Sequence, residues 1–279
     1  MISNRLKEKL EDFARSDRHF TVLTGSGISV ESNIPTFRGT EGYWRVGSQA
    51  YRPHQIATHK MFLENPDDVW AWYLHRRGVC RKARPNPGHL ALVEMERLFP
   101  DRFTLITQNI DGLHLRAGNS PQHVFEIHGN VFYMRCDRGC SHTVYPIPDE
   151  IPDKAKGEAV NDRDRRLLRC PSCGNPTRPH VLWFDESYNE EHYHYVSALK
   201  MSTQTGLLLV VGTSGSTNLP VLIAQKVARR FGLIVDVNIR ENPFSRMAVS
   251  SHGGFVQETC TVALPAVLKI LADAVRNRG

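Results

Sequence analysis

The chain has 279 residues, of which 41% are hydrophobic and 23% are charged, so we expect a packed, soluble protein of one large or two moderate domains rather than a disordered one. The net charge of +6 comes from scattered lysines and arginines, which favours a solvated surface or contacts with phosphates and acidic peptides over nucleic-acid binding. Neither a signal peptide nor a run of about 20 apolar residues that could cross a bilayer is present, so we expect a cytoplasmic protein.

The first two predicted elements are a helix and a strand. Residues 1–16 place Leu6, Leu10 and Phe13 on one face of a helix. The run Phe20–Thr24 has the apolar, β-branched character of a buried parallel strand.

A glycine turn, Gly25-Ser26-Gly27, follows this strand and precedes a helical start at Ile28-Ser29. Two close glycines let the backbone pass tightly, and a helix that opens there would aim free N–H groups and its positive dipole end at a phosphate. A plain tight turn explains the same residues, because the dinucleotide pattern lacks its third glycine and no Gly-Lys-Ser or Gly-Lys-Thr follows. The turn alone leaves both interpretations open.

The rest of the chain alternates helices with strands. Helices are predicted over 53–84, 88–98, 219–231 and 262–275, strands over 102–107, 124–127, 207–211 and 233–238, a loop with a helical turn over 109–116, and loops over 42–44 and 162–166. In the helix over 88–98 we expect Leu90, Leu92, Val93 and Met95 to form the apolar side. This alternation predicts an α/β protein with a doubly wound, Rossmann-like parallel sheet.

Polar or glycine-rich residues follow five predicted strands. They are Thr24-Gly25, Thr107-Gln108-Asn109, His128-Gly129, Gly212-Thr213-Ser214 and Asn238. Because ligands bind beyond the carboxyl ends of parallel strands, we expect all five groups to converge on one binding edge.

Residues 132–179 differ from the rest, since they are polar, carry prolines and contain two close cysteine pairs. Cys136 and Cys140 form the first pair, and Cys170 and Cys173 the second. This spacing predicts a zinc ribbon with a closed, structural four-thiolate site. His142 is a possible substitute ligand because the first pair is one residue wider than usual, and reduced buried thiols are the alternative. Cys80 and Cys260 fit ordinary buried residues.

Several of these segments together resemble the sirtuin family of NAD-dependent protein deacylases. They are Gly25-Ser26-Gly27-Ile28-Ser29, Pro35-Thr36-Phe37-Arg38-Gly39, Thr107-Gln108-Asn109-Ile110-Asp111, His128-Gly129, the four cysteines and Gly212-Thr213-Ser214, in matching order from Phe20 onward. The resemblance implies NAD as cosubstrate, structural zinc, and transfer of the acyl group of a modified lysine to ADP-ribose with release of nicotinamide.

The resemblance also implies residue roles. His128 would be the general base that activates a ribose hydroxyl, a task that suits histidine near neutral pH. Asn109 and Asp111 would surround nicotinamide and its ribose, although a helix cap also explains them. Arg38 would pair with pyrophosphate, and Phe37 would cover the ribose. The other implied NAD contacts are Gly25, Ser26, Gly27, Gln108, Gly212, Thr213, Ser214, Asn238 and Cys260.

On the substrate side, Val181-Leu182-Trp183-Phe184 matches the segment along which an acyl-lysine peptide would add as a strand. Asp185 departs from the glycine usual there. Tyr73 and Arg76 lie three apart on a helix and resemble the carboxylate-binding pair of the subclass that removes succinyl, malonyl or glutaryl groups. Core packing of an aromatic helix is the alternative, and Thr40 stands where that subclass often has alanine.

We therefore expect one catalytic unit over 1–279. Its large domain would combine 1–50, 85–130 and 180–279, and its small domain a helical module over 51–84 and a zinc module over 131–179. The resemblance implies lysine deacylation on proteins or peptides, with succinyl and malonyl groups accepted as well as acetyl, by a protein expected to be a monomer. An NAD hydrolase or ADP-ribosyltransferase on the same fold, and an inactive NAD-binding sensor, are the alternatives.

Overall fold

The computed structural model describes residues 2–36, 44–46 and 49–277. Phe37, Arg38 and Thr40, to which the sequence assigns roles, lie outside the described residues. No helix within the described ranges is long and apolar enough to cross a membrane.

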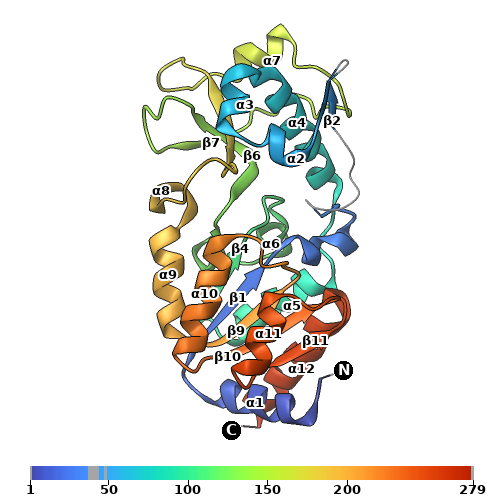
Figure 1. The fold of residues 1–279 in the computed structure, drawn as a ribbon, viewed down its shortest axis with the longest axis vertical. Coiled ribbons are helices and arrows are strands. Elements are labelled where there is room, and N and C mark those ends of the chain that lie inside the picture. The colour runs from blue at the N-terminus through green and yellow to red at the C-terminus, as the bar shows by residue number, and fades with distance from the viewer. Residues whose placement is uncertain (1, 37–43, 47–48, 278–279) are drawn as a thin grey trace.

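A six-stranded parallel sheet lies at the centre of the larger part of the molecule (Figure 1). Its strand order is β11-β10-β9-β1-β4-β5, and every neighbouring pair is parallel. The strands are β1 (His19–Thr24), β4 (Phe103–Thr107), β5 (Val124–Glu126), β9 (Thr205–Val211), β10 (Leu233–Asn238) and β11 (Gly254–Gln257). The central strand β9 is buried along its whole length, as its unbroken apolar run requires when both faces of a sheet are covered.

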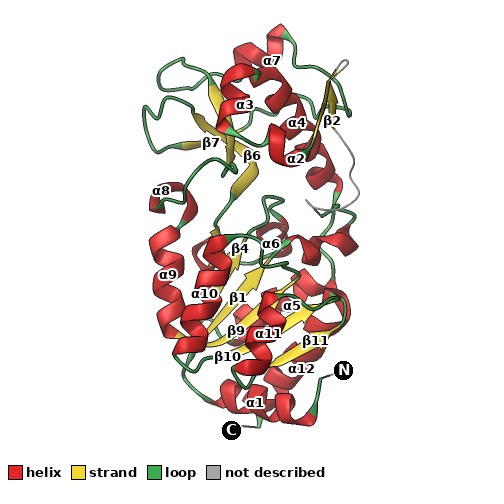
Figure 2. Ribbon diagram, viewed as in Figure 1, coloured by secondary structure: helices red, strands yellow, loops and turns green. Residues whose placement is uncertain are grey.

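Helices cover both faces of this sheet (Figure 2). One face packs on α1 (Asn4–Arg15), α5 (Pro87–Leu98) and α12 (Cys260–Arg276). The other face packs on α9 (Tyr195–Gln204), α10 (Asn218–Arg229) and α11 (Pro243–Ser250). The predicted doubly wound α/β class is therefore confirmed.

A smaller antiparallel sheet of order β7-β6-β8 lies beyond the carboxyl ends of the parallel strands (Figure 1). Its strands are β6 (Gly129–Cys136), β7 (Val144–Pro146) and β8 (Thr177–Val181). It shares one hydrophobic core with three helices of the 51–84 segment, which are α2 (Pro53–Ile56), α3 (His59–Glu64) and α4 (Pro66–Lys82). The two sequence segments that we assign to a small domain thus pack on each other.

Several local predictions were wrong. Residues 162–166 belong to a helix, α7 (Asp162–Leu167), because Asn161 and Asp164 form a capping box and Asp164 pairs with buried Lys154 at 2.8 Å. Leu90 is 51% exposed and does not belong to the apolar side of α5. Trp44, expected in a loop, begins β2 (Trp44–Val46), which pairs with β3 (Gln49–Tyr51).

A buried carboxyl group in β10 makes the stability of the fold depend on pH. Asp236 is fully buried, and its Oδ2 accepts a hydrogen bond from Asn242 Nδ2 at 2.7 Å, whereas Oδ1 has no hydrogen-bond partner among the described residues. Burial raises the pKa of Asp236 to about 7, against the opposing effect of the Asn242 hydrogen bond. The native state therefore keeps a proton that the unfolded chain loses near its ordinary pKa.

We expect the stabilisation that comes from this bound proton to be complete below about pH 4 and to disappear as the pH rises through about 7. Asp236→Asn cannot titrate. The free energy of unfolding of the wild type minus that of Asp236→Asn should therefore fall by a few kcal/mol between about pH 4 and about pH 7. A shift of one pKa unit corresponds to about 1.4 kcal/mol. Urea unfolding at several pH values measures this difference. If the unfolding free energies of the two proteins change with pH in the same way, the raised pKa of Asp236 is contradicted.

Candidate functional site

The polar groups that follow the parallel strands meet at one edge of the sheet, as the sequence predicts. Gln108 links three of them, because its backbone N–H donates to Thr24 O at 3.0 Å and its Nε2 donates to Thr213 Oγ1 at 2.9 Å. Asn238 Nδ2 donates to Thr213 O at 2.9 Å, and Asn109 Nδ2 donates to Gly25 O at 3.2 Å. The loops after β1, β4, β9 and β10 therefore form one hydrogen-bonded rim.

The glycines of this rim are required by the close approach of two loops. A Cβ atom on Gly27 would lie 2.6 Å from Gly212 Cα, and one on Gly25 would lie 2.7 Å from Thr213 Cβ. Gly212 also has a φ of +60°, which side-chain-bearing residues rarely adopt. The motif thus holds the β1 loop against the β9 loop.

The backbone N–H groups of these two glycines donate to carbonyl groups of the protein itself. Gly25 N donates to Val211 O at 2.9 Å, and Gly27 N donates to Gly212 O at 2.8 Å. The following segment, Ser26–Ser32, is a 3₁₀ helix rather than an α-helix. Any anion contact from this turn must therefore come from other groups.

Asn109 and Asp111 lie together with Ser29, a buried residue that sequence reasoning left out of the site. Ser29 Oγ donates to Asp111 Oδ2 at 2.7 Å and accepts from Asn109 Nδ2 at 3.2 Å. Asp111 Oδ1 accepts the N–H of Leu113 at 2.9 Å, so this carboxylate also caps α6 (Leu113–Ala117). Burial raises the pKa of Asp111, against the Leu113 and Ser29 hydrogen bonds. In the sequence, Ser29 could be assigned to the site only from its place two residues after the glycine turn.

His128 follows β5 and has hydrogen bonds on both ring nitrogens. Nδ1 lies 3.0 Å from Gln108 O, and Nε2 lies 2.8 Å from the hydroxyl of Tyr188. A carbonyl oxygen only accepts, so Nδ1 carries the proton and Nε2 keeps its lone pair. Burial lowers the pKa of His128 to about 4, against the opposing effect of Gln108. At neutral pH the imidazole is therefore uncharged, as a general base must be.

Gly129 fixes the position of His128. Its φ is +79°, and a Cβ atom there would lie 2.1 Å from His180 O on β8. Only glycine lets β6 begin this close to β8, where Leu182 N donates to His128 O at 3.0 Å. The small sheet and the histidine thus depend on each other.

The predicted substrate segment lies beside His128. Val181 ends β8 and is buried, as is Trp183, whereas Phe184 is 54% exposed. Leu182 N donates to His128 O, and Phe184 N donates to Ala57 O at 3.1 Å. A peptide that adds as a strand here must therefore pair with groups other than these two N–H groups.

Asp185, the departure from the usual glycine, caps a helix. Its carboxylate accepts the N–H groups of His59 at 2.8 Å and Lys60 at 3.1 Å, at the start of α3. Burial acts to raise the pKa of Asp185, but these backbone N–H groups prevail and lower it. The substitution thus stabilises the junction between the substrate segment and the helical module.

Tyr73 and Arg76 lie on α4, and Tyr73 belongs to the core. The hydroxyl of Tyr73 accepts from Trp183 Nε1 at 2.9 Å, and only 2% of the residue is exposed. Arg76 is partly buried, with its guanidinium 5.5 Å from the centre of the Trp72 ring. Burial raises the pKa of both Tyr73 and Asp111, and the positive charge of Arg76 is one of the smaller effects that oppose this. The buried Tyr73 agrees with the packing interpretation. The guanidinium three residues further along the same helix agrees with the carboxylate-binding interpretation.

Three remaining predicted NAD contacts lie on or next to the rim. Ser214 is exposed, with its Oγ 2.8 Å from Ser216 Oγ. Asn238 is partly buried at the end of β10. Cys260 is buried at the start of α12, where Thr261 N donates to Glu31 Oε2 at 3.2 Å, and burial raises the pKa of its thiol to about 12.

The four paired cysteines come together at one end of the small sheet, with Cys136 at the end of β6 and the other three in the turns before β7 and β8. All four Sγ atoms lie within 4.8 Å of one another. The pairs Cys136–Cys173 and Cys140–Cys170 are each 3.6 Å apart. This matches the edge of about 3.8 Å of a tetrahedron with Zn–S bonds of about 2.3 Å. The residues therefore fit a structural zinc ion, and His142, which is exposed, is not part of the cluster.

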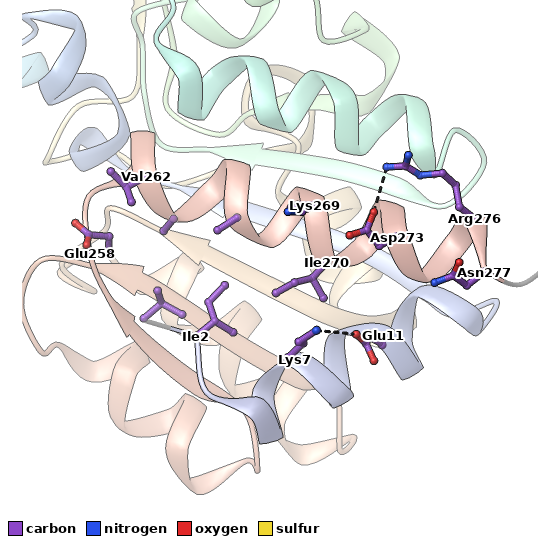
Figure 3. A pocket seen from close by; sticks show the side chains of 13 residues that line it. Ile2, Lys7, Glu11, Glu258, Val262, Lys269, Ile270, Asp273, Arg276 and Asn277 are labelled. Carbon is purple, nitrogen blue, oxygen red and sulfur yellow. Dashed lines mark hydrogen bonds and ion pairs between the residues drawn. The ribbon is translucent and has the colours of Figure 1, made fainter.

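A separate open groove of about 820 Å³ lies between α1, β11 and α12 (Figure 3). Its lining includes Ile2, Val262 and Ile270, and the ion pairs Lys7–Glu11 and Asp273–Arg276 lie along it. None of the predicted site residues that the structure describes lines this groove.

Comparison with known proteins agrees with this geometry. The model of the "Sir2 family" matches residues 25–218. A protein named NAD-dependent protein deacylase from Leptospira interrogans (strain Fiocruz L1-130) is 38% identical over 96% of this chain and 99% of its own.

Two solved structures share the fold. A Sir2 homologue mutant in complex with 2'-O-acetyl ADP-ribose has a TM-score of 0.79 at 29% identity and covers 96% of this chain and 97% of its own. A complex of Sir2, a p53 peptide and NAD+ has a TM-score of 0.71 at 26% identity, covering 94% of this chain and 97% of its own. Because the family model and the Leptospira interrogans relative both match most of its length, the chain belongs to the Sir2 family.

Proposed function

We propose that this protein is an NAD-dependent protein lysine deacylase that releases nicotinamide and forms O-acyl-ADP-ribose and free lysine. The observation that carries the proposal is His128, an uncharged imidazole at the carboxyl edge of the sheet whose Nδ1 is bonded to the backbone carbonyl of Gln108, so that Nε2 is the basic atom. The Leptospira interrogans relative has this activity in its name.

The proposed roles follow from the hydrogen bonds of each residue. NAD supplies the reactive nicotinamide–ribose bond. His128 Nε2 accepts a proton from a ribose hydroxyl, which makes that hydroxyl nucleophilic. Asn109 and Asp111, held by Ser29, orient the nicotinamide and its ribose, while Gln108 positions His128 through its carbonyl oxygen.

The remaining rim would bind the rest of NAD. Thr213, Ser214 and Asn238 offer polar groups to adenosine, with Gly25, Ser26, Gly27 and Gly212 shaping the wall and Cys260 beside it. Phe37 and Arg38 keep their proposed roles at the ribose and the pyrophosphate. The zinc ion would act only structurally, because four thiolates leave no ligand position for substrate.

We further propose that acyl groups with a terminal carboxylate, such as succinyl and malonyl, are preferred substrates. Tyr73 Oη accepts a hydrogen bond from Trp183, so its own O–H remains able to donate to a carboxylate. The Arg76 guanidinium, on the same helix, would add a positive charge and paired N–H donors for that carboxylate. A phenol and a guanidinium three residues apart on one helix would together form a clamp for the carboxylate of the acyl group.

Arg76→Met tests this clamp. We expect kcat/KM for a succinyl peptide to fall by about 10- to 100-fold, because a hydrogen bond to a charged group contributes about 1.5–3 kcal/mol. The value for the matching acetyl peptide should change by less than about threefold. Lys82→Met, an exposed cation at the end of the same helix, is the matched control. Equal losses for both acyl groups would show that Arg76 only supports packing.

The rival functions on this fold differ in their need for an acyl peptide. An NAD hydrolase releases nicotinamide without one, an ADP-ribosyltransferase modifies an unacylated acceptor, and a sensor binds NAD without turnover. Nicotinamide release should be measured with NAD alone and with acetyl, succinyl and malonyl peptides. The proposal predicts release that depends on the acyl peptide, and peptide-independent release would contradict it.

A further inference from the structure

Tyr188 contacts the proposed base from the segment between β8 and α8 (Glu190–Tyr193). Its hydroxyl lies 2.8 Å from His128 Nε2, and the two ring centroids are 5.8 Å apart. Its ring also stacks on Tyr195, with 6.0 Å between centroids and an interplanar angle of 21°. These two aromatic contacts and the hydrogen bond to His128 thus help to determine where the phenol lies.

The direction of the hydrogen bond follows from the tautomer of His128. Nδ1 donates to the carbonyl of Gln108, so Nε2 is the acceptor and Tyr188 donates its O–H to it. Burial raises the pKa of Tyr188, against a hydrogen bond with Thr217, so the phenol keeps its proton at neutral pH. A neutral imidazole has one acceptor atom, and Tyr188 uses it.

The backbone on both sides of Tyr188 is anchored. Glu186 accepts from Arg178 Nη2 at 2.7 Å, and its own N–H donates to Trp183 O at 3.1 Å. Asn189 caps α8 by accepting the N–H of His192 at 2.9 Å. The Tyr188 side chain itself is only partly buried, so a rotation of the phenol away from His128 leaves these anchors in place.

We propose that Tyr188 is a positioning residue for His128, whose hydroxyl holds the acceptor atom of the base until a ribose hydroxyl of NAD replaces it. This inference rests on the proposed role of His128. Because Nε2 accepts one hydrogen bond, the phenol and the ribose hydroxyl exclude each other there. Before NAD binds, the Tyr188 hydroxyl orients the imidazole and covers its Nε2 atom. When NAD binds, the hydrogen bond between Tyr188 and Nε2 is lost.

Tyr188→Phe removes the hydroxyl and keeps the ring. Diethyl pyrocarbonate acylates the free lone pair of an uncharged imidazole, and peptide mass spectrometry resolves His128 from the other histidines. At pH 7 we expect His128 to react about two- to tenfold faster in the variant, the factor that corresponds to the net loss of one hydrogen bond. Tyr195→Phe changes the stacked neighbour and should react as the wild type does. Equal His128 rates in wild type and Tyr188→Phe would overturn the inference.

Saturating ADP-ribose gives a second comparison. A ribose hydroxyl then covers Nε2 in both proteins, so the two labelling rates should become equal. A difference that persists would show that the phenol and the ribose do not compete.

Kinetics separate this role from a merely structural one. We expect Tyr188→Phe to lower KM for NAD and to raise kcat/KM about two- to tenfold, with kcat within about twofold of the wild type. A tenfold loss of kcat would overturn the inference, because Tyr188 would then take part in the chemical step. The labelling experiment needs no turnover. Absence of nicotinamide release by the wild type would therefore refute the proposed function without deciding the role of Tyr188.

Discussion

His128→Gln lowers kcat for acyl-peptide-dependent nicotinamide turnover by about 10²- to 10⁴-fold, the usual contribution of a general base. Glutamine can still accept the hydrogen bond of Tyr188 but cannot take a proton from a ribose hydroxyl near neutral pH. NAD affinity, measured by calorimetry, should change by no more than a few fold. His54→Gln, an exposed histidine on α2, is the control and should keep wild-type turnover.

The pH profile of the wild type extends the same prediction. Because burial lowers the pKa of His128 to about 4, protonation removes the base only as the pH falls through about 4, well below the ordinary histidine value. The acid limb of kcat/KM, which reports the free enzyme, should therefore lie nearer pH 4 than pH 6.5. A limb at pH 6.5 or above, or a His128→Gln variant with more than half of the wild-type kcat, would contradict the role of His128.

Removing zinc unfolds the small antiparallel sheet. Cys136→Ser breaks a cluster whose Sγ atoms lie within 4.8 Å of one another, and binding of zinc to such sites in small peptides contributes about 10–16 kcal/mol. We expect one zinc per chain in the wild type, its loss in the variant, and a fall in Tm of more than about 10 °C. Hydrogen exchange should show lost protection in β6–β8 and retained protection in β1 and β9.

Turnover should disappear together with the metal. Gly129, next to His128, begins β6, and Val181 at the end of β8 leads into the substrate segment. Cys80→Ala, a buried cysteine outside the cluster, is the control and should keep its zinc. A metal-free protein with an unchanged Tm and an ordered small sheet would contradict the structural role of zinc.

The parallel sheet and the position of the candidate site could be predicted because their signals are local. Each of the five predicted strands is a short apolar run that ends in, or is followed by, a polar or glycine residue on the ligand-binding side. β10 was predicted over its full range, and β9 within two residues of its start. The cysteine pairs have a spacing that few other structures require.

The missed elements have weak local signals. The segment before α9 is rich in histidine and tyrosine, and His194, with a φ of +52°, separates α8 from α9. β11 begins at the second of two glycines and is specified by parallel pairing with β10. Residues 162–166 have the mixed charges of a solvated loop, but the buried Lys154–Asp164 pair makes them helical.

The structural roles of some residues could not be predicted from the sequence, because the residues that they contact lie far along the chain. The glycine turn was recognised, but Gly25 and Gly27 are required by the backbone around Gly212 rather than by a ligand. Tyr188 has no motif, and only the fold brings its hydroxyl to His128, 60 residues away. The roles of Phe37 and Arg38 stay predictions.

The products of one turnover test the central proposal most directly. Wild-type protein should be incubated with NAD and an acetyl-lysine or succinyl-lysine peptide, and all products should be measured by mass spectrometry. We predict equal amounts of nicotinamide, deacylated peptide and O-acyl-ADP-ribose. Nicotinamide accompanied by ADP-ribose, with the acyl peptide unchanged, would contradict the proposed deacylase and show an NAD hydrolase instead.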